Sequence, residues 1–333
     1  MGAVKVFVYE FITGGGLGPA PLPASLAREG DMMAQALVRD LAAIPGVEVL
    51  LARDSRLPPA PPPAATLSAL PEEGALDTFR RGLERCHAAW PVAPETGGTL
   101  EALARQTLKA RRILLSSRPE AVRAAGSKIA TSMVLNAAGI RAVPTFSHPT
   151  LIPPLSGPWV VKPDDGAGCE DAWRLSDADS AGLWLVDHPG HVAQPWIEGD
   201  ALSLSLICCA GDAALLSINR QRLILDDRLG LAGIEVNALS DADGRMALLG
   251  GAIAHAIPGL WGYVGVDLVA TASGPVVIEV NPRLTTSYCG IQEATGTNPA
   301  QWVLDLARGL PLAEVRALVP RPVSLDLESR LAS

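Results

Sequence analysis

The chain has 333 residues, of which 48% are hydrophobic and 19% are charged. This composition excludes wholesale disorder, and the length is enough for two or three packed units. The formal net charge is −8, and no block of lysine and arginine is present. An acidic chain without such a block is unsuited to binding a phosphate backbone, so no nucleic-acid partner is expected.

Cysteine usage and the hydropathy pattern bear on location. The five cysteines are an odd number without a CxxC spacing, which argues against a disulfide framework and a zinc site and favours a reducing, cytoplasmic compartment. The first residues, MGAVKVFVYEF, are typical of a strand and not of a signal peptide. Residues 246–266 carry no formal charge, but they include His255 and Pro258. We therefore expect a core helix, a turn and a strand there, and no membrane partner.

The first third of the chain alternates strand and helix patterns. Residues 4–9 and 47–52 read as strands, and residues 31–43 between them read as a helix. Five prolines within residues 57–65 predict an extended surface loop. Helices are then expected at 72–88 and 99–108, and a short strand at 112–116. This order predicts a parallel sheet covered by helices.

The pattern of predicted elements changes at Ser127. The pattern predicts a helix ending at Gly139, an edge strand containing Pro144, and a buried strand at 159–163 that leads into the glycine loop DDGAGCED. Strands are expected at 191–197 and 202–209, and a hairpin from 263–271 and 275–281. The last expected element is a helix at 299–308.

Two carboxylates interrupt the apolar strands of that hairpin. If the turn is centred on Ser273, Asp267 and Glu279 face each other with Cβ atoms about 5 Å apart. Asn281 follows two residues after Glu279 and shares its face. Such a set of hard oxygen ligands is the kind that Mg²⁺ prefers beside phosphates. The other interpretation is a buried ion pair with Arg220, Arg222 or Arg283.

Two lysines are candidates for anion binding. Lys162 ends a buried strand, and the glycines that follow let backbone N–H groups approach phosphate oxygens. The loop is not a Walker A sequence and no GxGxxG is present, so it could equally be an ordinary turn. Lys128 lies at the start of a helix, where free N–H groups suit an anion, although a solvated surface lysine is the simpler interpretation.

The segment Gln194-Pro195-Trp196-Ile197-Glu198-Gly199 could recognise a flat base. A strand that leaves its sheet at a proline frees backbone groups, and Trp196 and Ile197 would supply apolar walls. The alternative is an ordinary strand end with a core tryptophan.

Taken in this order, the motifs resemble those of the ATP-grasp superfamily. The resemblance covers residues 115–310 and rests on the set VVKP-DDGAGCED, QPWIEG, GVDLV and VVIEVNPR. The segments NPRLTTSY (281–288) and YEFITGGG (9–16) are similar to a carboxylate–amine ligase branch that includes the tyramine–glutamate ligase of methanofuran synthesis. The implied fold is α/β, with a parallel-sheet pre-ATP-grasp domain at 1–120. A small lobe (121–195) and a large lobe (196–333) would sandwich ATP.

The resemblance also implies roles for individual residues. ATP would contact Lys128, Lys162, Gly166, Ala167, Gly168, Gln194, Trp196 and Ile197. One or two Mg²⁺ or Mn²⁺ ions would bind Asp267, Glu279 and Asn281, and Arg283 and Lys162 would act on the transferred phosphoryl group. Ala201 stands where the family usually has a ribose-binding glutamate, so Asp200 or Glu198 would have to substitute. Gly265 stands where some relatives have an arginine.

The implied reaction forms an amide. A carboxylate would take the γ-phosphate of ATP to give an acyl phosphate and ADP, and an amine would then displace phosphate. The implied acid is an amino acid such as glutamate, and the implied amine is similar to tyramine or tyrosine. Expected substrate contacts are Tyr9, Gly15, Gly16, Arg220, Thr285, Ser287 and Tyr288, with Glu10, Asp165 and Glu293 as candidate bases.

Two other functions fit the same motifs. A nucleotide-binding regulator that has lost catalysis would account for Ala201, although it would not require the full set of lysines and carboxylates. A kinase that phosphorylates without ligation would use the same ATP site. The apolar helices near the C-terminus could also support a homodimer.

Overall fold

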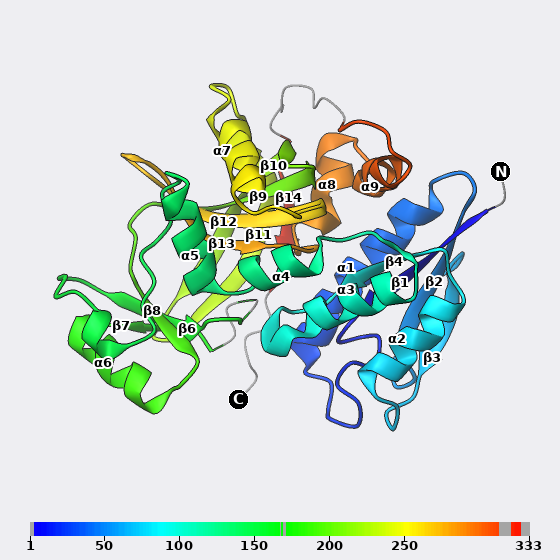
Figure 1. Ribbon diagram of the computed structural model, residues 1–333, viewed down its shortest axis with the longest axis horizontal. Coiled ribbons are helices and arrows are strands. Elements are labelled where there is room, and N and C mark those ends of the chain that lie inside the picture. Colours follow the sequence, from blue (N-terminus) through cyan, green and yellow to red (C-terminus); the bar gives the residue numbers. More distant parts are fainter. Residues whose placement is uncertain (1–2, 167, 169–170, 313–320, 328–333) are drawn as a thin grey trace.

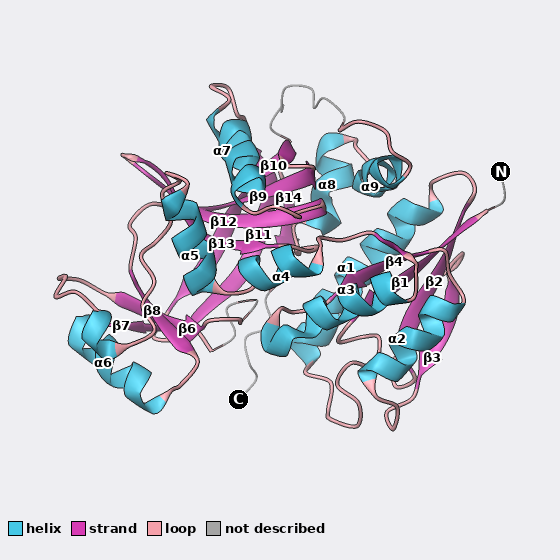
Figure 2. Cartoon of the chain, in the orientation of Figure 1, coloured by secondary structure: helices cyan, strands magenta, loops and turns pink. Residues whose placement is uncertain are grey.

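The computed structural model describes residues 3–166, 168, 171–312 and 321–327, which form three sheets with helices packed on them (Figure 1). The N-terminal part lies at the right of the view, a small sheet with α6 at the lower left, and the largest sheet between and above them (Figures 1 and 2). None of the described helices has the length and apolar character required to cross a bilayer.

The N-terminal part contains a five-stranded parallel sheet with strand order β3-β2-β1-β4-β5. Apolar strands covered on both faces by helices favour this arrangement. Its elements are β1 (Val4–Glu10), α1 (Ala24–Ala42), β2 (Val47–Asp54), β3 (Ala65–Ala69), α2 (Ala75–Glu84), β4 (Ala88–Val92), η1 (Thr96–Gly98), α3 (Thr99–Lys109) and β5 (Ile113–Leu114).

Two helices lead from this sheet into a small antiparallel sheet with strand order β7-β6-β8. Ser127 begins the second helix, because its hydroxyl accepts a hydrogen bond from the N–H of Ala130. The elements are α4 (Pro119–Ala125), α5 (Lys128–Ala137), η2 (Pro149–Leu151), β6 (Trp159–Pro163), β7 (Trp173–Leu175), α6 (Ala178–Asp187) and β8 (His191–Pro195).

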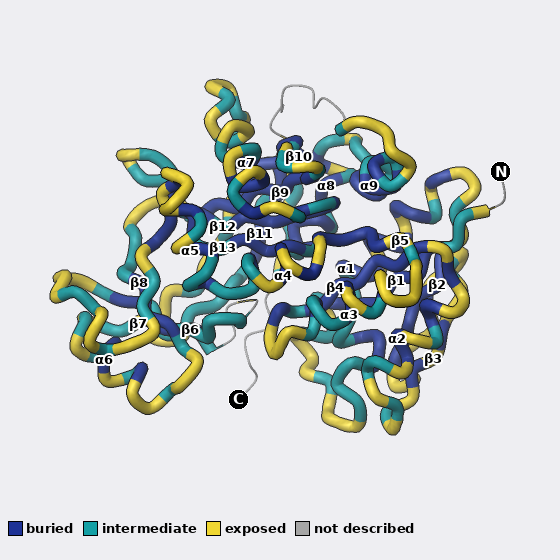
Figure 3. Tube along the Cα trace, in the orientation of Figure 1, coloured by how far each residue is buried: buried dark blue, intermediate teal, exposed yellow. Residues whose placement is uncertain are grey.

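The third sheet is antiparallel and has six strands in the order β13-β12-β9-β10-β11-β14. Its elements are β9 (Asp200–Cys209), β10 (Asp212–Leu225), β11 (Leu229–Leu239), α7 (Arg245–Ala256), β12 (Gly262–Thr271), β13 (Gly274–Asn281), α8 (Tyr288–Thr295), α9 (Pro299–Ala307) and β14 (Val323–Asp326). The central strands of this sheet are mostly buried in Figure 3, with exposed positions on the outer helices.

The two faces of this sheet pack against different helices. One carries leucines and valines, such as Leu204 and Val266, which pack with α5 and α7. On the other face α8 and α9 contact α1, so one apolar core includes both Val6 of the parallel sheet and Val303 of α9. The N-terminal part is therefore held against the large sheet by a shared core.

Most predicted elements are confirmed, including the strands at 4–9, 47–52 and 159–163 and the helix, turn and strand within 246–266. The helix expected at 72–88 is wrong at its end, because α2 stops at Glu84 and β4 begins at Ala88. The edge strand around Pro144 forms only isolated bridges, from Ala142 to Val277 and from Phe146 to Ala193. A proline cannot donate to a ladder, which explains the interruption.

Candidate active site

The β12–β13 hairpin brings its two carboxylates face to face. Asp267 is paired with Glu279, as the sequence predicts. The turn, however, is one residue tighter than expected, since Thr271 pairs with Gly274. A register shift directly after Asp267, a β-bulge, restores the pairing of the two acids.

Asp267 is held by two amide side chains. The Gln221 Nε2 donates to its Oδ1 at 2.8 Å, and the Asn281 Nδ2 donates to its Oδ2 at 2.9 Å. Burial and the negative charge of Glu279 raise the pKa of Asp267 to about 7. Gln221 comes from β10, a strand that the sequence pattern did not reveal.

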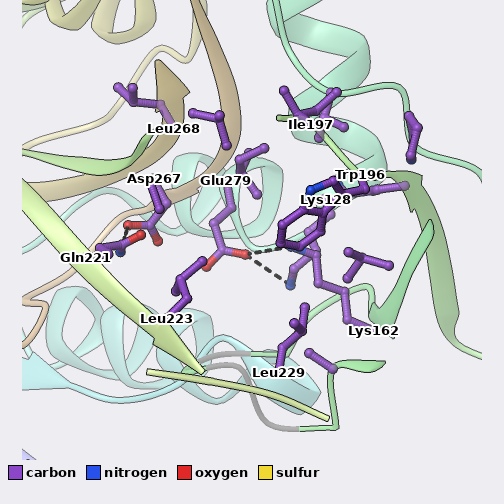
Figure 4. Close-up of a pocket in the computed structure, with 18 of the residues that line it drawn as sticks. Lys128, Lys162, Trp196, Ile197, Gln221, Leu223, Leu229, Asp267, Leu268 and Glu279 are labelled. Atoms are coloured by element: carbon purple, nitrogen blue, oxygen red, sulfur yellow. Dashed lines mark hydrogen bonds and ion pairs between the residues drawn. The ribbon is translucent and has the colours of Figure 1, made fainter. Parts of the chain in front are cut away.

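Glu279 lies between two lysines from different elements. Its Oε2 is 3.7 Å from Lys128 Nζ at the start of α5 and 3.5 Å from Lys162 Nζ on β6 (Figure 4). Burial alone would raise the pKa of Glu279, but the two ammonium groups outweigh it and lower the pKa to about 2. The carboxylate is therefore ionised and both lysines are drawn to one point.

These oxygens fit a divalent cation. No group of three or more His, Cys, Asp and Glu gathers in the part of the chain that the structure describes, so the set consists of two carboxylates and one amide. Glu279 has two lysines within 4 Å, whereas the Asp267 oxygens accept hydrogen bonds from two uncharged amides, which bring no positive charge. A hard cation with oxygen ligands would supply that charge, and the remaining ligands of Mg²⁺ are commonly phosphates and water.

The glycine loop is anchored from two sides. Lys128 Nζ donates to the carbonyl oxygens of Gly166 at 2.7 Å and of Asp164 at 3.2 Å. From the N-terminal part, Thr96 Oγ1 donates to the Asp165 carbonyl and the Gly97 N–H donates to Asp165 Oδ2. Gly168 is exposed with φ of +67°, and Ala167 lies outside the described residues.

One pocket joins the two lysines and the two acids to the segment predicted to bind a base. Gln194, Trp196 and Ile197 line the pocket, with Leu223 and Leu229 closing its apolar side (Figure 4). Gln194 is buried and its Nε2 donates to Thr145 Oγ1 at 3.0 Å. An apolar slot with charged groups at one end suits a flat base that carries phosphates.

Asp200 does not face the pocket, as a residue that replaced the ribose-binding glutamate would have to do. Gly199 and Ala201 line the pocket, and strand alternation directs the exposed Asp200 side chain away from it. Asp200 therefore does not replace the missing ribose ligand in this structure. Gly199 has φ of +151° and lies so close to the Ala270 carbonyl that a Cβ would meet it at 2.3 Å, so only glycine fits there.

Arg283 lies two residues after strand β13 and contacts the N-terminal part. Its Nε donates to both carboxylate oxygens of Glu95, at 3.0 and 3.1 Å, and its Nη2 reaches Asn281 Oδ1 at 3.4 Å. Both partners of this ion pair are almost fully buried. Glu95, at the end of β4, was not recognised in the sequence because only the tertiary fold brings it to Arg283.

Hydroxyl groups gather behind the hairpin. Thr285 Oγ1 is 2.9 Å from Ser287 Oγ, and Tyr263 OH lies within 3.3 Å of both. Thr285 is half-buried and packs on Gly265, where a Cβ would meet its Cγ2 at 2.5 Å. This close approach explains why Gly265, and not a larger residue, precedes Asp267 by two positions.

Several expected substrate contacts lie elsewhere. Tyr9 is fully buried against Phe79, with ring centroids 5.1 Å apart, in the core of the N-terminal part. Gly15 packs on Ala69 and Gly16 packs on Phe11, so both shape the turn after β1. These residues form the core because β1 is covered by helices on both sides.

Two more expected substrate contacts also lie away from the pocket. Arg220 pairs with Glu235 at 3.4 Å, and its register partner Leu202 belongs to the leucine core on the face opposite Asp267. Tyr288 is fully buried against Tyr263, with ring centroids 5.3 Å apart. Arg220 therefore points to the face opposite Asp267, and Tyr288 is enclosed in the core.

Comparison with known families agrees with this architecture. Residues 125–287 match the model of the ATP-grasp domain, and residues 47–122 match that of the pre ATP-grasp 3 domain. A tyramine–L-glutamate ligase from Methanocaldococcus jannaschii is 30% identical over 219 residues, which are 65% of this chain and 61% of that protein. One from Methanocaldococcus fervens is 29% identical over 212 residues, 63% of this chain and 62% of that protein. The chain thus spans about three fifths of the length of these relatives.

Solved structures give the same result for the fold. A protein described as belonging to the ATP-grasp superfamily, from Archaeoglobus fulgidus, is 26% identical with a TM-score of 0.69, covering 95% of this chain and 91% of that chain. An L-amino acid ligase from Bacillus licheniformis has a TM-score of 0.65 at 18% identity, covering 92% and 74%. With its pre-ATP-grasp domain and its ATP-grasp domain, the chain belongs to the ATP-grasp superfamily.

Proposed function

We propose that this protein is an ATP-dependent carboxylate–amine ligase that releases ADP and phosphate. The observation that supports this most is the convergence of Lys128, Lys162, Asp267 and Glu279 at one end of a pocket whose other end is apolar. These charges come from helix α5, strand β6 and the β12–β13 hairpin, which lie far apart in the chain, and a ligand with several negative charges is what the lysines would bind. The names of the curated relatives support the same reaction class.

The lysines and the hairpin have separate tasks in this proposal. Lys128 and Lys162 would bind phosphate oxygens, which would release Glu279 from its present contacts. Asp267, Glu279 and Asn281 would hold one or two Mg²⁺ ions, and a bound Mg²⁺ offsets the charge of the phosphates. Arg283, kept in place by Glu95, would face the phosphoryl group as it moves to the acid.

The reaction itself needs positioning more than covalent help from the protein. The acid's carboxylate oxygen attacks the γ-phosphorus, the bond to ADP breaks, and an acyl phosphate results. The amine nitrogen then attacks the acyl carbon, and phosphate leaves. Because water would hydrolyse the acyl phosphate, the contacts of Asp165 with Thr96 and Gly97 would help to hold the glycine loop over the site.

For the substrates we propose glutamate or a similar amino acid as the acid and a tyramine-like amine. Support comes from the names of the two curated relatives and from the half-buried Thr285 beside the hairpin. Ser287, by contrast, is buried and its hydroxyl lies within hydrogen-bond distance of Ser205 and Tyr263. For the domains we propose 1–120, 121–195 and 196–333. Each of these segments holds the strands of one sheet.

Release of ADP and phosphate tests the proposal. The purified protein is incubated with Mg²⁺, ATP and glutamate, with and without each amine of a panel that includes tyramine and tyrosine. Turnover that requires both acid and amine supports the ligase. Turnover with the acid alone, giving a stable phosphorylated product, would identify a kinase. Tight ATP binding without turnover for any pair would favour the nucleotide-binding regulator.

A further inference from the structure

The ligase proposed above must take a proton from its amine, and the carboxylates expected to do so are occupied elsewhere. Glu10 accepts hydrogen bonds from the N–H groups of Ile12 and Thr13 and from the Thr13 hydroxyl, so it closes the turn after β1. Asp165 is bound to the Gly97 N–H, and Glu293 is exposed on α8. Asp267 and Glu279 belong to the proposed metal site.

Helix α1 places another carboxylate beside the segment that follows β13. Gly30 of α1 packs directly on the Glu10 carboxylate at the end of β1. The helical residues before Gly30 therefore extend about 9 Å beyond the carboxyl edge of the parallel sheet. Open parallel sheets bind their ligands at this edge. The overhanging turn meets the ATP-grasp part, since Arg28 donates to the Leu327 carbonyl.

Glu29 lies in this overhanging turn and points toward the segment that follows the metal strand. Its Oε1 accepts a hydrogen bond from the hydroxyl of Thr286, three residues after Arg283. Thr286 is buried and Glu29 is half-buried, so the carboxylate is neither enclosed in the core nor fully exposed. The two residues are 257 positions apart in the chain.

The Glu29 carboxylate has no cationic partner within 4 Å in the part of the chain that the structure describes. By contrast, Glu279 has two lysines and Glu95 has Arg283. The titratable groups near Glu29 are Arg283 and Cys289, with Glu10 beside the same helix. A half-buried carboxylate with no cation in direct contact can accept one, and an amine substrate arrives as a cation at neutral pH.

We propose that Glu29 binds the ammonium group of the amine substrate and accepts its proton, and that Thr286 fixes the carboxylate for this task. This inference rests on the proposed ligase function. One N–H proton of the ammonium passes to Glu29 Oε2, and the freed nitrogen pair attacks the acyl carbon. The C–N bond forms and the bond from carbon to the phosphate oxygen breaks. The departing phosphate takes the second nitrogen proton, and Glu29 returns its proton to water.

The test separates the two half-reactions with Glu29→Gln, which keeps an oxygen for Thr286 but removes the charge and the base. Tyramine and hydroxylamine serve as nucleophiles with glutamate as the acid, because hydroxylamine is uncharged at neutral pH and needs no base. We expect Glu29→Gln to lower tyramine-dependent amide formation about 100-fold while hydroxamate formation stays within about twofold of wild type. Raising the pH toward the pKa of the amine should reduce the difference in amide formation between Glu29→Gln and wild type.

Matched variants complete the experiment. Glu84→Gln removes an exposed glutamate at the end of α2 and should behave as wild type. Thr286→Ser should keep activity that Thr286→Val loses in part. Unchanged tyramine kinetics in Glu29→Gln would overturn the inference, as would an equal loss with both nucleophiles. If wild-type protein forms neither hydroxamate nor amide from glutamate, the ligase proposal itself fails, and the inference fails with it.

Discussion

Glu95 and Arg283 are 188 positions apart in the chain, yet the Arg283 Nε donates to both oxygens of the Glu95 carboxylate at 3.0 and 3.1 Å. One partner follows β4 of the parallel sheet and the other follows the metal strand β13. Their side chains are only 5% and 11% exposed, so the ion pair is one of the few charged contacts between the two parts that water does not screen. It joins the fold of the N-terminal part to the geometry of the candidate site.

Breaking this pair should therefore affect both stability and turnover. Glu95→Gln leaves a buried guanidinium without its counter-charge, and we expect a loss of about 3 kcal/mol in the free energy of unfolding. ATP turnover should fall as well, because Arg283 loses its orientation. Urea denaturation gives the first quantity. Glu48→Gln, which breaks the exposed pair with Lys5, should change stability by less than about 1 kcal/mol. Equal effects of the two substitutions would contradict the account.

Glu279 should be indispensable for turnover. In Glu279→Gln the two lysines lose their shared counter-charge and the proposed metal loses a ligand, so we expect ATP turnover to fall by at least about 100-fold. Steady-state ADP release measures this. The matched control is Glu235→Gln, which removes a carboxylate paired with Arg220 on the same sheet. A Glu279→Gln enzyme with a rate near that of wild type would rule out the proposed site.

Lys162 should bind ATP by its charge. Lys162→Met keeps the aliphatic stem but removes the ammonium group 3.5 Å from Glu279, and we expect ATP to bind about 10 to 100 times more weakly. Isothermal titration calorimetry measures the dissociation constant. Lys109→Met, at the exposed end of α3, provides the comparison and should bind ATP as wild type does. If ATP bound equally weakly to both variants, the loss would come from the change in net charge and not from the site of Lys162.

Gly199 should be irreplaceable at the start of the strand that follows the pocket. An alanine Cβ there would meet the Ala270 carbonyl at 2.3 Å, and φ is +151°. We expect Gly199→Ala to lower the free energy of unfolding by about 2 kcal/mol or more. Gly190 also has a positive φ, of +91°, but open space around it, so Gly190→Ala isolates the backbone cost. Thermal unfolding that ranks the two variants in the opposite order would refute the steric argument.

Glu10 should make stability depend on pH. Burial raises the pKa of its carboxyl, and hydrogen bonds from Thr13 oppose this only in part. Since the folded pKa lies above the unfolded one, Glu10 destabilises the fold increasingly as pH rises from the unfolded value through the folded one. The unfolding free energy of Glu10→Gln relative to wild type should therefore increase between pH 4 and pH 7. Chemical denaturation at several pH values checks the slope, and a decrease would contradict it.

The sequence predicted what depends on local pattern. The pairing of Asp267 with Glu279 follows from an apolar hairpin with one short turn. Even there, two errors compensated for each other, because the tighter turn is offset by a register shift that no pattern announced. The position of Lys162 at the end of a buried strand was likewise readable from its apolar neighbours.

Contacts between distant elements were not predictable in this way. Glu95 and Glu29 each receive their role from a residue more than 180 positions away, and neither interrupts an apolar strand as Asp267 does. Tyr9 was expected to face the substrate because of the motif around it. It is buried because the alternation of β1 directs it into the aromatic core with Phe79.

The fate of the acid's oxygen atoms tests the central proposal most directly. Glutamate labelled with a heavy oxygen isotope in its side-chain and main-chain carboxylates is incubated with the protein, Mg²⁺, ATP and tyramine, and the released phosphate is analysed by mass spectrometry. Formation of an acyl phosphate predicts one labelled oxygen in each phosphate and one amide for each ADP. Amide formed with unlabelled phosphate, or ADP released without amide or labelled phosphate for every pair of substrates in the panel, would contradict it.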